Sequence, residues 1–563
     1  MGTRISVIVA VYNPGPHFDD LVGSLLRQTL PADQFEVLFC DDGSDEETQA
    51  RLDAVSAAHP HLKTLKLEHS GWPGSPRNVG IDTAVGKYVF FCDHDDTFGD
   101  EALQRLADYA DQNSSDVVIG KLTGVGRSLP RGIFRQNIPN AVLGQDPLLE
   151  ILTPHKLFRT EFIREHGIRF PAGKVRLEDH MFVLKAYFAA DVISVLADYP
   201  CYYWTRRTDK PSASASLIEP EHYYHYLGVV LDIVEENVAP GPARDALLQH
   251  WYRGKVLKRL AGRHFVAYPD EYRDELLAVV RPFALKRFAP EVDQYLSFPM
   301  RLRSALLRAD RADGLRALAE VESGLKAEAN VTSISWDESR RLRLEIEARV
   351  SFEDGSELEF EPVAAVAAVE SAGAVAATGW RWRPPVAFAP EVVTDALLDA
   401  GPDLAAARIE VFVRARHDSS DYVQPLADSQ APVEAWGGPG VMRTTIVIDP
   451  RSARSGRSVT KYSDLVAQVS YAGWNFGTSV RIDPELLAAA ELSERIIGRR
   501  AFTVLTRGNN RLYLKARRLP APPPKPVVPK PVVKEKPVLR TRVVRKARRI
   551  AGQVRRRLLR AIH

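Results

Sequence analysis

Three apolar runs in the first 120 residues, at 5–11, 35–40 and 87–92, each end in a polar cluster. The clusters are Tyr12-Asn13, Asp41-Asp42 and Asp93-His94-Asp95-Asp96. Segments with helical spacing separate the runs, and continuous apolar runs are typical of buried parallel strands. This alternation predicts an open α/β sheet. Because ligands bind at the carboxyl ends of the strands in such sheets, the clusters predict one binding site.

The pattern changes twice along the 563 residues, a length that exceeds a single hydrophobic core. A helical region follows the α/β part, and short alternating strands then continue to about residue 514, as in β-sandwich-like domains. A Pro/Gly-rich stretch near 430–442 favours two such domains. We therefore predict an α/β domain at 1–218, a helical linker at 219–325, β-domains at 326–435 and 436–519, a Pro/Lys linker at 520–539 and a basic amphipathic helix at 540–563.

The formal net charge of +3 conceals two segments of opposite sign. Residues 520–563 hold 14 Lys and Arg against one acid, so the rest of the chain carries a net charge of −10. An apolar stripe recurs between the arginines of 540–563, at Val543, Ala547, Ile550, Val554, Leu558 and Ile562. Such a helix suits an anionic membrane surface. Nucleic-acid binding and a solvated tail are the alternative interpretations.

The three cysteines, Cys40, Cys92 and Cys201, form no CxxC pair and are odd in number. They argue against a disulfide framework and for a reducing compartment. No apolar run approaches the roughly 20 residues that a membrane helix needs. We therefore expect a cytoplasmic protein, held peripherally at the inner face of the cell membrane by residues 540–563.

Asp93 and Asp95 stand at positions i and i+2 where a strand passes into a loop. Both carboxylates can turn toward one cation, and Mg²⁺ is bound in proteins by one or two carboxylates together with substrate phosphates. Residues 41–44 (DDGS) occupy the same place one strand earlier, where a carboxylate can accept the N–H of a nucleotide base. Taken alone, both patterns also fit Asx turns and helix caps.

Four further residues carry groups suited to nucleotide chemistry. Arg77 opens a predicted helix, where it either contacts a nucleotide or caps the surface. Arg206 and Arg207, followed by Ser212, fit a diphosphate clamp or a surface loop.

Glu178 and Asp179 precede His180 at the start of another predicted helix. A general base with a neighbouring acid or imidazole that tunes it has this composition. An acid-rich helix N-terminus without catalytic function has it too.

Six motifs in one order, VIVAVYN, CDDGSDE, SPRNVGID, FFCDHDDT, LEDH and YYWTRR, resemble glycosyltransferase family 2, whose members have the GT-A fold. The resemblance covers about residues 4–215. It implies a UDP-sugar donor, a Mn²⁺ or Mg²⁺ ion, and inverting transfer to an acceptor hydroxyl. The donor-binding positions that it implies are Val11, Tyr12, Asp41, Asp42, Arg77, Asp93, His94, Arg206, Arg207 and Ser212. It implies Asp95 and Asp93 as metal ligands, Asp179 as the catalytic base and Glu178 as its partner.

The order of a transferase domain, a helical linker and β-domains is also similar to the bacterial enzymes that glycosylate wall teichoic acids. This likeness implies UDP-GlcNAc as donor and an anionic glycopolymer as acceptor. Four basic residues of the predicted helix 251–265 suit a phosphate-rich chain, namely Lys255, Lys258, Arg259 and Arg263. A solvated basic face is the alternative.

Three other functions stay open at this point. The chain can glycosylate a capsular polysaccharide, exopolysaccharide or other glycan. A nucleotidyltransferase or dinucleotide enzyme is disfavoured, because residues 9–16 contain no GxGxxG motif. A catalytically inactive protein that binds polymer through its β-domains is disfavoured by the intact acids. The β-domains also offer surfaces for a homo-oligomer.

Overall fold

The computed structural model describes residues 2–127, 129–206, 217–363, 379–426, 440–459 and 461–520. The predicted helix at 540–563 and nearly all of the predicted linker at 520–539 lie outside these residues. Among the residues described, no helix is long and apolar enough to cross a membrane.

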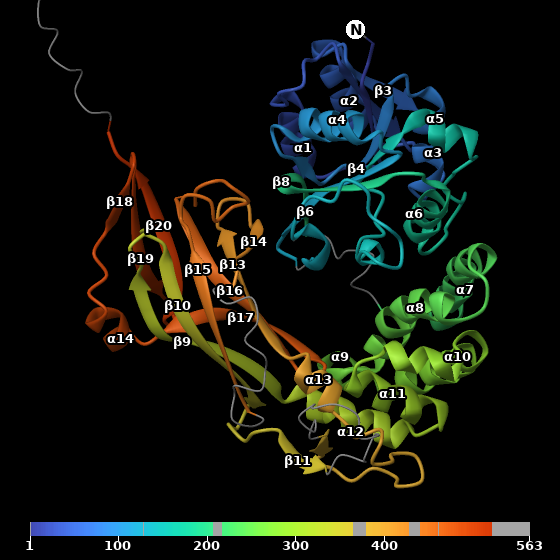
Figure 1. Cartoon of the computed structure of the whole chain (residues 1–563). Helices are drawn as coiled ribbons and strands as arrows, with labels where there is room; N and C mark the ends of the chain where they lie inside the picture. The colour runs from blue at the N-terminus through green and yellow to red at the C-terminus, as the bar shows by residue number, and fades with distance from the viewer. Residues whose placement is uncertain are drawn as a thin grey trace, which may run out of the picture. The chain divides into compact units, whose positions relative to one another are not determined.

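An eight-stranded sheet forms the core of the first domain (Figure 1). Its strands are β1 (Ile5–Val11), β2 (Phe35–Asp41), β3 (Leu62–Lys66), β4 (Tyr88–Asp93), β5 (Thr97–Phe98), β6 (Val117–Val125), β7 (Leu157–Arg159) and β8 (Ile193–Thr205). Their order in space is β3-β2-β1-β4-β7-β6-β8-β5, and β1 pairs in parallel with both β2 and β4. The predicted α/β sheet is confirmed, and the three polar clusters follow neighbouring strands.

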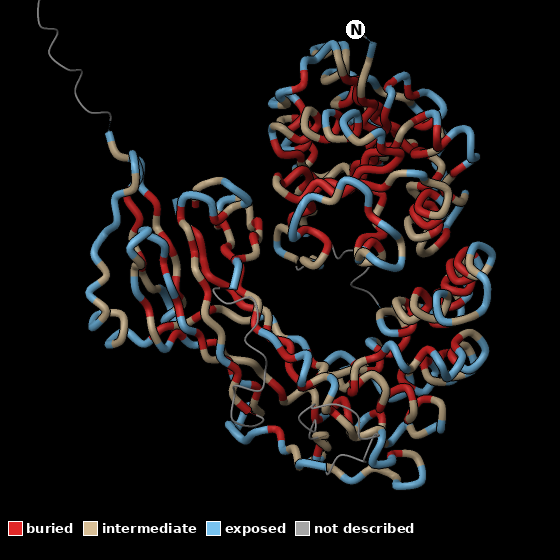
Figure 2. Tube along the Cα trace, in the orientation of Figure 1, coloured by how far each residue is buried: buried red, intermediate tan, exposed pale blue. Residues whose placement is uncertain are grey.

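The helices of this domain are α1 (His17–Leu26), α2 (Glu46–Ala58), α3 (Gly74–Thr83), α4 (Ala102–Asn113), α5 (Thr160–Glu165) and α6 (Glu178–Ala189). Figure 2 shows the buried residues gathered along the strands that these helices cover. Helix α3 packs especially closely, since a Cβ on Gly80 would stand 2.3 Å from Cγ2 of Ile8. The first turn of α3, which carries Arg77, is therefore held firmly against the sheet.

The predicted helical region is confirmed between Pro220 and Ser323. Its elements are α7 (Pro220–Asn237), α8 (Pro242–Trp251), η3 (Tyr252–Val256), η4 (Leu257–Leu260), α9 (Gly262–Val266), α10 (Asp270–Arg287), η5 (Pro290–Tyr295), α11 (Phe298–Arg308) and α12 (Ala312–Ser323). The prediction of one basic helix over 251–265 was wrong. A π-helical turn, a 3₁₀ turn and Gly262 at φ +52° interrupt the segment, and a left-handed glycine cannot continue an α-helix.

A ten-stranded sheet dominates the C-terminal part. It contains β9 (Leu325–Trp336), β10 (Leu342–Phe352), β13 (Arg408–Ala415), β14 (Asp421–Val423), β15 (Val441–Ile448), β16 (Tyr462–Tyr471), β17 (Trp474–Ile482), β18 (Arg495–Ile497), β19 (Arg500–Arg507) and β20 (Arg511–Arg518). The hairpin of β11 (Glu359–Val363) and β12 (Gly379–Arg383) forms a separate small sheet, and the short helices are α13 (Gly401–Ala405) and α14 (Pro484–Ala489).

The predicted boundary at 435/436 does not separate two sheets. Strand β10 pairs with β15, and β9 pairs with β17, so strands from both sides of the boundary share one sheet. An isolated bridge between Leu426 and Ile446 also pairs residues from the two sides of the predicted boundary. Alternating apolar residues show that a segment is a strand, but they do not show which strand it pairs with. The Pro/Gly-rich stretch was therefore a misleading guide to the sheet's limits.

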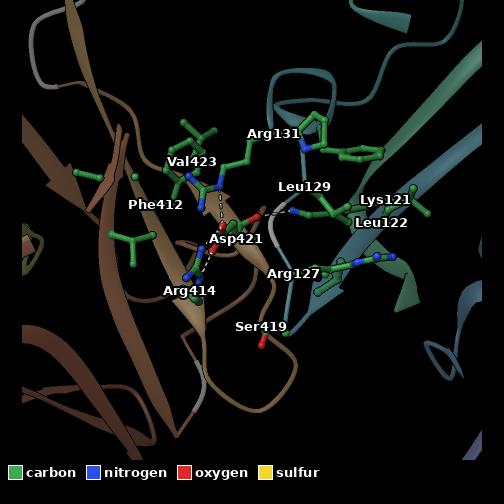
Figure 3. Close-up of a pocket in the computed structure, with 18 of the residues that line it drawn as sticks. Lys121, Leu122, Arg127, Leu129, Arg131, Phe412, Arg414, Ser419, Asp421 and Val423 are labelled. Atoms are coloured by element: carbon green, nitrogen blue, oxygen red, sulfur yellow. Dashed lines mark hydrogen bonds and ion pairs between the residues drawn. The ribbon is translucent and has the colours of Figure 1, made fainter. Parts of the chain in front are cut away.

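Strand β14 of this sheet also contacts the first domain (Figure 3). Nε of Arg131 donates to Oδ2 of Asp421 at 2.6 Å, and Nζ of Lys121 donates to the Asp421 carbonyl oxygen at 2.7 Å. Arg135 forms a further ion pair with Glu410. The loop that follows β6 is thereby fixed on the sheet by charged contacts.

Candidate active site

A cavity of about 850 Å³ opens at the carboxyl ends of β1 and β4. Twelve of the predicted site residues line it: Val11, Tyr12, Asp42, Arg77, Asp93, His94, Asp95, Glu178, Asp179, Arg206, Lys255 and Arg259. Asp41, Lys258 and Arg263 do not line it, and Arg207 and Ser212 lie outside the described residues. Segments that are far apart in sequence thus converge on one hollow, as the parallel sheet requires.

One end of the cavity has the composition of a base-binding site. The ring of Tyr12 stacks on His69 with 4.4 Å between centroids. Asp42 is buried, and its Oδ1 accepts the backbone N–H of Ser70 at 2.9 Å and the Ser70 hydroxyl at 2.7 Å. Asp41 lies behind it, fully buried, and caps the next turn by accepting a backbone N–H at 3.1 Å. Asp42 is therefore the member of the pair that lines the cavity, whereas Asp41 lies behind it and supports the turn.

Arg77 lies at the centre of the site and is only 3% exposed. One terminal nitrogen donates to Oδ1 of Asp179 at 2.8 Å, and the other donates to Oδ1 of Asp93 at 2.9 Å. Its guanidinium lies 5.1 Å from the ring centroid of Phe170. Arginine does not lose its proton in proteins, so this buried cation requires its two carboxylates. Arg77 fixes the end of β4 relative to the start of α6.

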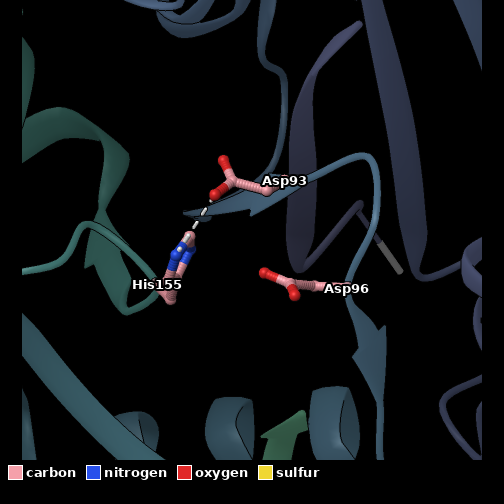
Figure 4. A group of neighbouring side chains, drawn as sticks. All are labelled: Asp93, Asp96 and His155. Atoms are coloured by element: carbon pink, nitrogen blue, oxygen red, sulfur yellow. Dashed lines mark ion pairs between the residues drawn. The ribbon is translucent and has the colours of Figure 1, made fainter. Parts of the chain in front are cut away.

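Asp93, Asp96 and His155 place one ligand atom each within 4.8 Å of one another (Figure 4). Nε2 of His155 lies 3.6 Å from Oδ2 of Asp93. Asp96 is fully buried and accepts the Tyr202 hydroxyl at 2.6 Å and a backbone N–H at 2.7 Å. Burial, aided by the charges of Asp93 and Asp95, raises the pKa of Asp96 well above its ordinary value. Asp96 thus supports the cluster from behind.

Of the three acids at the carboxyl end of β4, Asp93 and Asp95 line the cavity. Both oxygens of Asp96 are already engaged by hydrogen bonds, and burial lowers the pKa of His155. Two carboxylates beside a neutral imidazole, at the wall of a nucleotide-sized cavity, fit a hard divalent cation that completes its shell with water and phosphate oxygens.

The acids of α6 follow a strained residue. Leu177 has φ 60°, a left-handed conformation that costs a leucine about 1–2 kcal/mol, and it turns the chain so that Glu178 and Asp179 line the cavity. Burial, followed by the charge of Asp179, raises the pKa of Glu178 to about 7. Nε1 of Trp251 donates to Nδ1 of His180 at 3.2 Å and so ties α8 to α6.

Basic residues also line the cavity. Arg206 and Arg127 are two of them, and the Arg127 guanidinium lies 3.8 Å from the centroid of the Trp204 ring. Lys255 and Arg259 reach the cavity from the helical region. These cations share the cavity with the acids of β4 and α6, an arrangement that suits an anionic ligand close to a metal ion.

Only two of the four predicted acceptor-binding residues therefore line the cavity. Lys258 is exposed, and Arg263 is exposed and forms an ion pair with Glu353. The π-helical turn, the 3₁₀ turn and the left-handed Gly262 interrupt the regular helix that would have placed all four side chains on neighbouring faces.

Sequence reasoning missed four residues that belong to the site: His69, Arg127, His155 and Arg176. None stands in one of the six motifs. His155 and Arg127 lie in the irregular segment between β6 and α6, where no periodicity indicated their direction. The excess of basic residues near the end of β6 was the one available signal for Arg127.

The sequence matches two known family models, glycosyl transferase family 2 over residues 6–177 and the glycosyl transferase TarS linker domain over residues 220–319. A poly(ribitol-phosphate) beta-glucosyltransferase of Bacillus spizizenii is 30% identical over 335 residues, which are 57% of this chain and 51% of that protein. The poly(ribitol-phosphate) beta-N-acetylglucosaminyltransferase TarP of Staphylococcus aureus is 30% identical over 281 residues, which are 48% of this chain and 85% of that protein.

A solved structure is similar as well. The crystal structure of S. aureus TarS 1–349 in complex with UDP-GlcNAc superposes with a TM-score of 0.51 and 27% identity, and the match covers 63% of this chain and 98% of that one. The chain spans about half the length of the Bacillus relative.

The sheet, the acids at its carboxyl edge and these matches define a glycosyltransferase with the GT-A fold. The chain belongs to glycosyltransferase family 2, and with its helical linker it resembles the poly(ribitol-phosphate) glycosyltransferases of wall teichoic acid. The predicted family is confirmed.

The raised pKa of Glu178 predicts how stability depends on pH. An unfolded glutamate releases its proton near pH 4.5, whereas folded Glu178 keeps it to about 7, so the native state loses stability as the pH rises through this window. We expect the Tm of Glu178→Gln, measured relative to the Tm of wild type, to rise between pH 5 and pH 8.

Thermal unfolding at unit pH steps measures this difference. Glu165→Gln, which removes a half-exposed carboxylate from α5, is the matched control and should show a much smaller trend. A Tm difference for Glu178→Gln that stays constant across the range would contradict the assignment of its ionisation.

Proposed function

We propose that this protein transfers a sugar from a UDP-sugar to a hydroxyl of a ribitol-phosphate polymer of the teichoic acid type. The observation that carries the proposal is that one cavity joins a base-binding end, a carboxylate pair and several basic residues. Relatives named as poly(ribitol-phosphate) glycosyltransferases support the choice of acceptor. A role in polymer binding alone would not explain why two carboxylates are paired around Arg77.

UDP-GlcNAc is the proposed donor. The TarS structure that superposes on this chain holds UDP-GlcNAc, and TarP is named as an N-acetylglucosaminyltransferase. The Bacillus relative is named as a glucosyltransferase, so UDP-glucose is the competing donor. Tyr12 and Asp42 would hold the uracil, since a ring and a buried carboxylate flank that end of the cavity.

The proposed mechanism is a single inverting displacement. Asp179 takes the proton of the acceptor hydroxyl while that oxygen attacks the anomeric carbon, and the bond to the UDP oxygen breaks. Arg77 acts as a positioning residue, because its two ion pairs fix Asp179 relative to Asp93. Arg206 and Arg127 stabilise the charge that develops on the departing diphosphate.

Asp93 and Asp95 would hold a Mn²⁺ or Mg²⁺ ion. When bound, such an ion neutralises charge on the diphosphate and so makes it a better leaving group. His155 and Asp96 would act from behind, by orienting Asp93 and the chain that follows it.

The acceptor is proposed to approach along the helical region. Lys255 and Arg259 line the cavity from that side, and Trp251 anchors the region to α6 through His180. A phosphate-rich chain lying on these cations would bring a hydroxyl to Asp179.

We also propose that residues 540–563 bind the inner face of the cell membrane and keep the enzyme near its polymer. Ten basic residues alternate there with an apolar stripe, and each contributes about 1 kcal/mol near an acidic leaflet. Assembly into a homo-oligomer through the C-terminal sheet is a further proposal.

Asp179→Asn tests the base assignment. A general base contributes about 10²–10⁴-fold, so we expect kcat for polymer glycosylation to fall at least about 100-fold while the Kd for UDP stays within about twofold of wild type. Rates of UDP release and calorimetric titration with UDP measure the two quantities. Asp191→Asn, at an exposed position just after the end of α6, is the matched control, and near wild-type transfer by Asp179→Asn would refute the role of Asp179.

Asp95→Ala, unlike Asp179→Asn, should weaken the binding of UDP. Removal of a cavity-facing carboxylate weakens the site for the cation, so UDP binding should become as weak with Mg²⁺ or Mn²⁺ as it is with EDTA. Titrations with and without metal test this, and a variant whose UDP affinity still rises fully with metal would exclude Asp95 as a ligand.

Deletion of 540–563 tests the membrane proposal. The full chain should co-sediment with phosphatidylglycerol vesicles at low salt, and the truncated chain should not. The double variant Ile550→Asp and Leu558→Asp keeps every arginine and should also fail to bind, which separates membrane insertion from simple attraction of charges. Unchanged sedimentation of the truncated chain would end the proposal.

A further inference from the structure

A second cavity, of about 540 Å³, lies where the loop after β6 meets the C-terminal sheet (Figure 3). Lys121, Arg127 and Arg131 line it from the catalytic domain, and Arg414 and Asp421 line it from β13 and β14. The proposed donor, metal ion and catalytic base all lie at the main cavity and not at this one. Its walls are built by two parts of the chain almost 300 residues apart in sequence, and the contact of Arg131 with Asp421 is one of those that close it.

The cavity has a surplus of positive charge. Among the described residues that line it, four are basic and one, Asp421, is acidic. Asp421 accepts Nε of Arg131 at 2.6 Å and two nitrogens of Arg414 at 2.7 and 2.8 Å. One carboxylate thus serves two guanidinium groups, and Arg131 also donates to Oε1 of Gln468 at 3.2 Å. The N–H groups beyond these bonds suit a second anion.

Lys121 adds a cation that is almost completely buried. Its Nζ donates to the carbonyl oxygen of Asp421 at 2.7 Å and lies 3.8 Å from the centroid of the Tyr422 ring. Burial lowers the pKa of Lys121 to about 8, so the ammonium is still mostly protonated near pH 7. The carboxylates of Asp421 and Asp418 already act on this ammonium, and an anion that enters the cavity would add to their effect.

Arg127 connects this cavity with the donor cavity, because its side chain lines both. The guanidinium lies 3.8 Å from the centroid of the Trp204 ring, which lines the donor cavity as well. A chain that carries repeated phosphates therefore has a cation on its route from one cavity to the other.

We propose that the second cavity is a phosphate subsite, which binds a phosphodiester of the acceptor polymer at a distance from the reacting hydroxyl. The choice of polymer rests on the proposed function, whereas the phosphate chemistry rests on the cavity alone. Guanidinium groups bind phosphate oxygens with two parallel hydrogen bonds. Ser479 and Ser419 add hydroxyls, and Leu122 and Phe412 offer apolar surface for the carbon atoms of a polyol.

A carboxylate placed in the cavity tests the subsite. Ser479 lies on β17, outside the catalytic domain, and is half-buried in the cavity wall. It pairs with Val466, which pairs with Phe412, so its side chain shares their face of the sheet. Ser479→Glu adds a negative charge there, and Ser479→Gln is the neutral control of the same size. With full-length protein and poly(ribitol phosphate), we expect the KM for polymer to rise about tenfold in Ser479→Glu, the equivalent of one lost charged contact, and to stay near wild type in Ser479→Gln.

Three readouts separate the subsite from a general defect. The KM for a single ribitol-phosphate repeat and the rate of UDP-sugar hydrolysis without acceptor should be equal in all three proteins, because neither needs the second cavity. An equal KM for polymer in all three proteins would overturn the proposal. So would a matching rise in the KM for the single repeat. If Ser479→Glu does not fold, Gly477→Glu takes its place, because Gly477 lies two residues away on the same face of β17 and a Cβ there meets nothing within 4 Å.

Inorganic phosphate supplies a test that does not depend on the proposed acceptor. With UDP and Mg²⁺ present to fill the donor cavity, phosphate should raise the Tm of wild type and Ser479→Gln above that in chloride of equal ionic strength, but not the Tm of Ser479→Glu. Failure of wild type to glycosylate poly(ribitol phosphate), together with this phosphate effect, would reject the acceptor and retain the subsite. No stabilisation of wild type by phosphate would reject the subsite itself.

Discussion

The two ion pairs of Arg77 are the interaction on which the site depends. A guanidinium that is 3% exposed and cannot release its proton must have both Asp93 and Asp179 beside it. Removing one partner of a buried ion pair costs about 3–5 kcal/mol, so the end of β4 and the start of α6 are coupled. The close packing of Gly80 on Ile8 fixes the helix that carries Arg77. The donor side of the cavity and the proposed base are thus one rigid unit.

Much of the catalytic domain could be predicted from the sequence, because its information is local. A buried parallel strand needs a continuous apolar run, and the sheet then gathers the residues that follow each run at one edge. Tyr12, Asp42 and Asp95 were found in this way, and the structure places all three at one cavity. The alternation of strands and helices also sufficed to separate this domain from the helical region.

The features that the sequence did not reveal depend on contacts between distant segments. Pairing of β10 with β15 joins what looked like two domains, since alternation defines strands without defining their partners. The break at Gly262 turned Arg263 away from the cavity. His155 and Arg127 reach the site from irregular chain. Arg127 lines both cavities, and the loop that carries it is held by the contact of Arg131 with Asp421.

Release of UDP by the full-length chain, measured against a panel of UDP-sugars with and without poly(ribitol phosphate), tests the central claim most directly. The account predicts that one donor of the panel, UDP-GlcNAc before UDP-glucose, is consumed much faster when the polymer is present, that EDTA abolishes this acceleration, and that the sugar is recovered on the polymer with its anomeric configuration inverted. No turnover of any UDP-sugar, or turnover that the polymer does not accelerate, would contradict it.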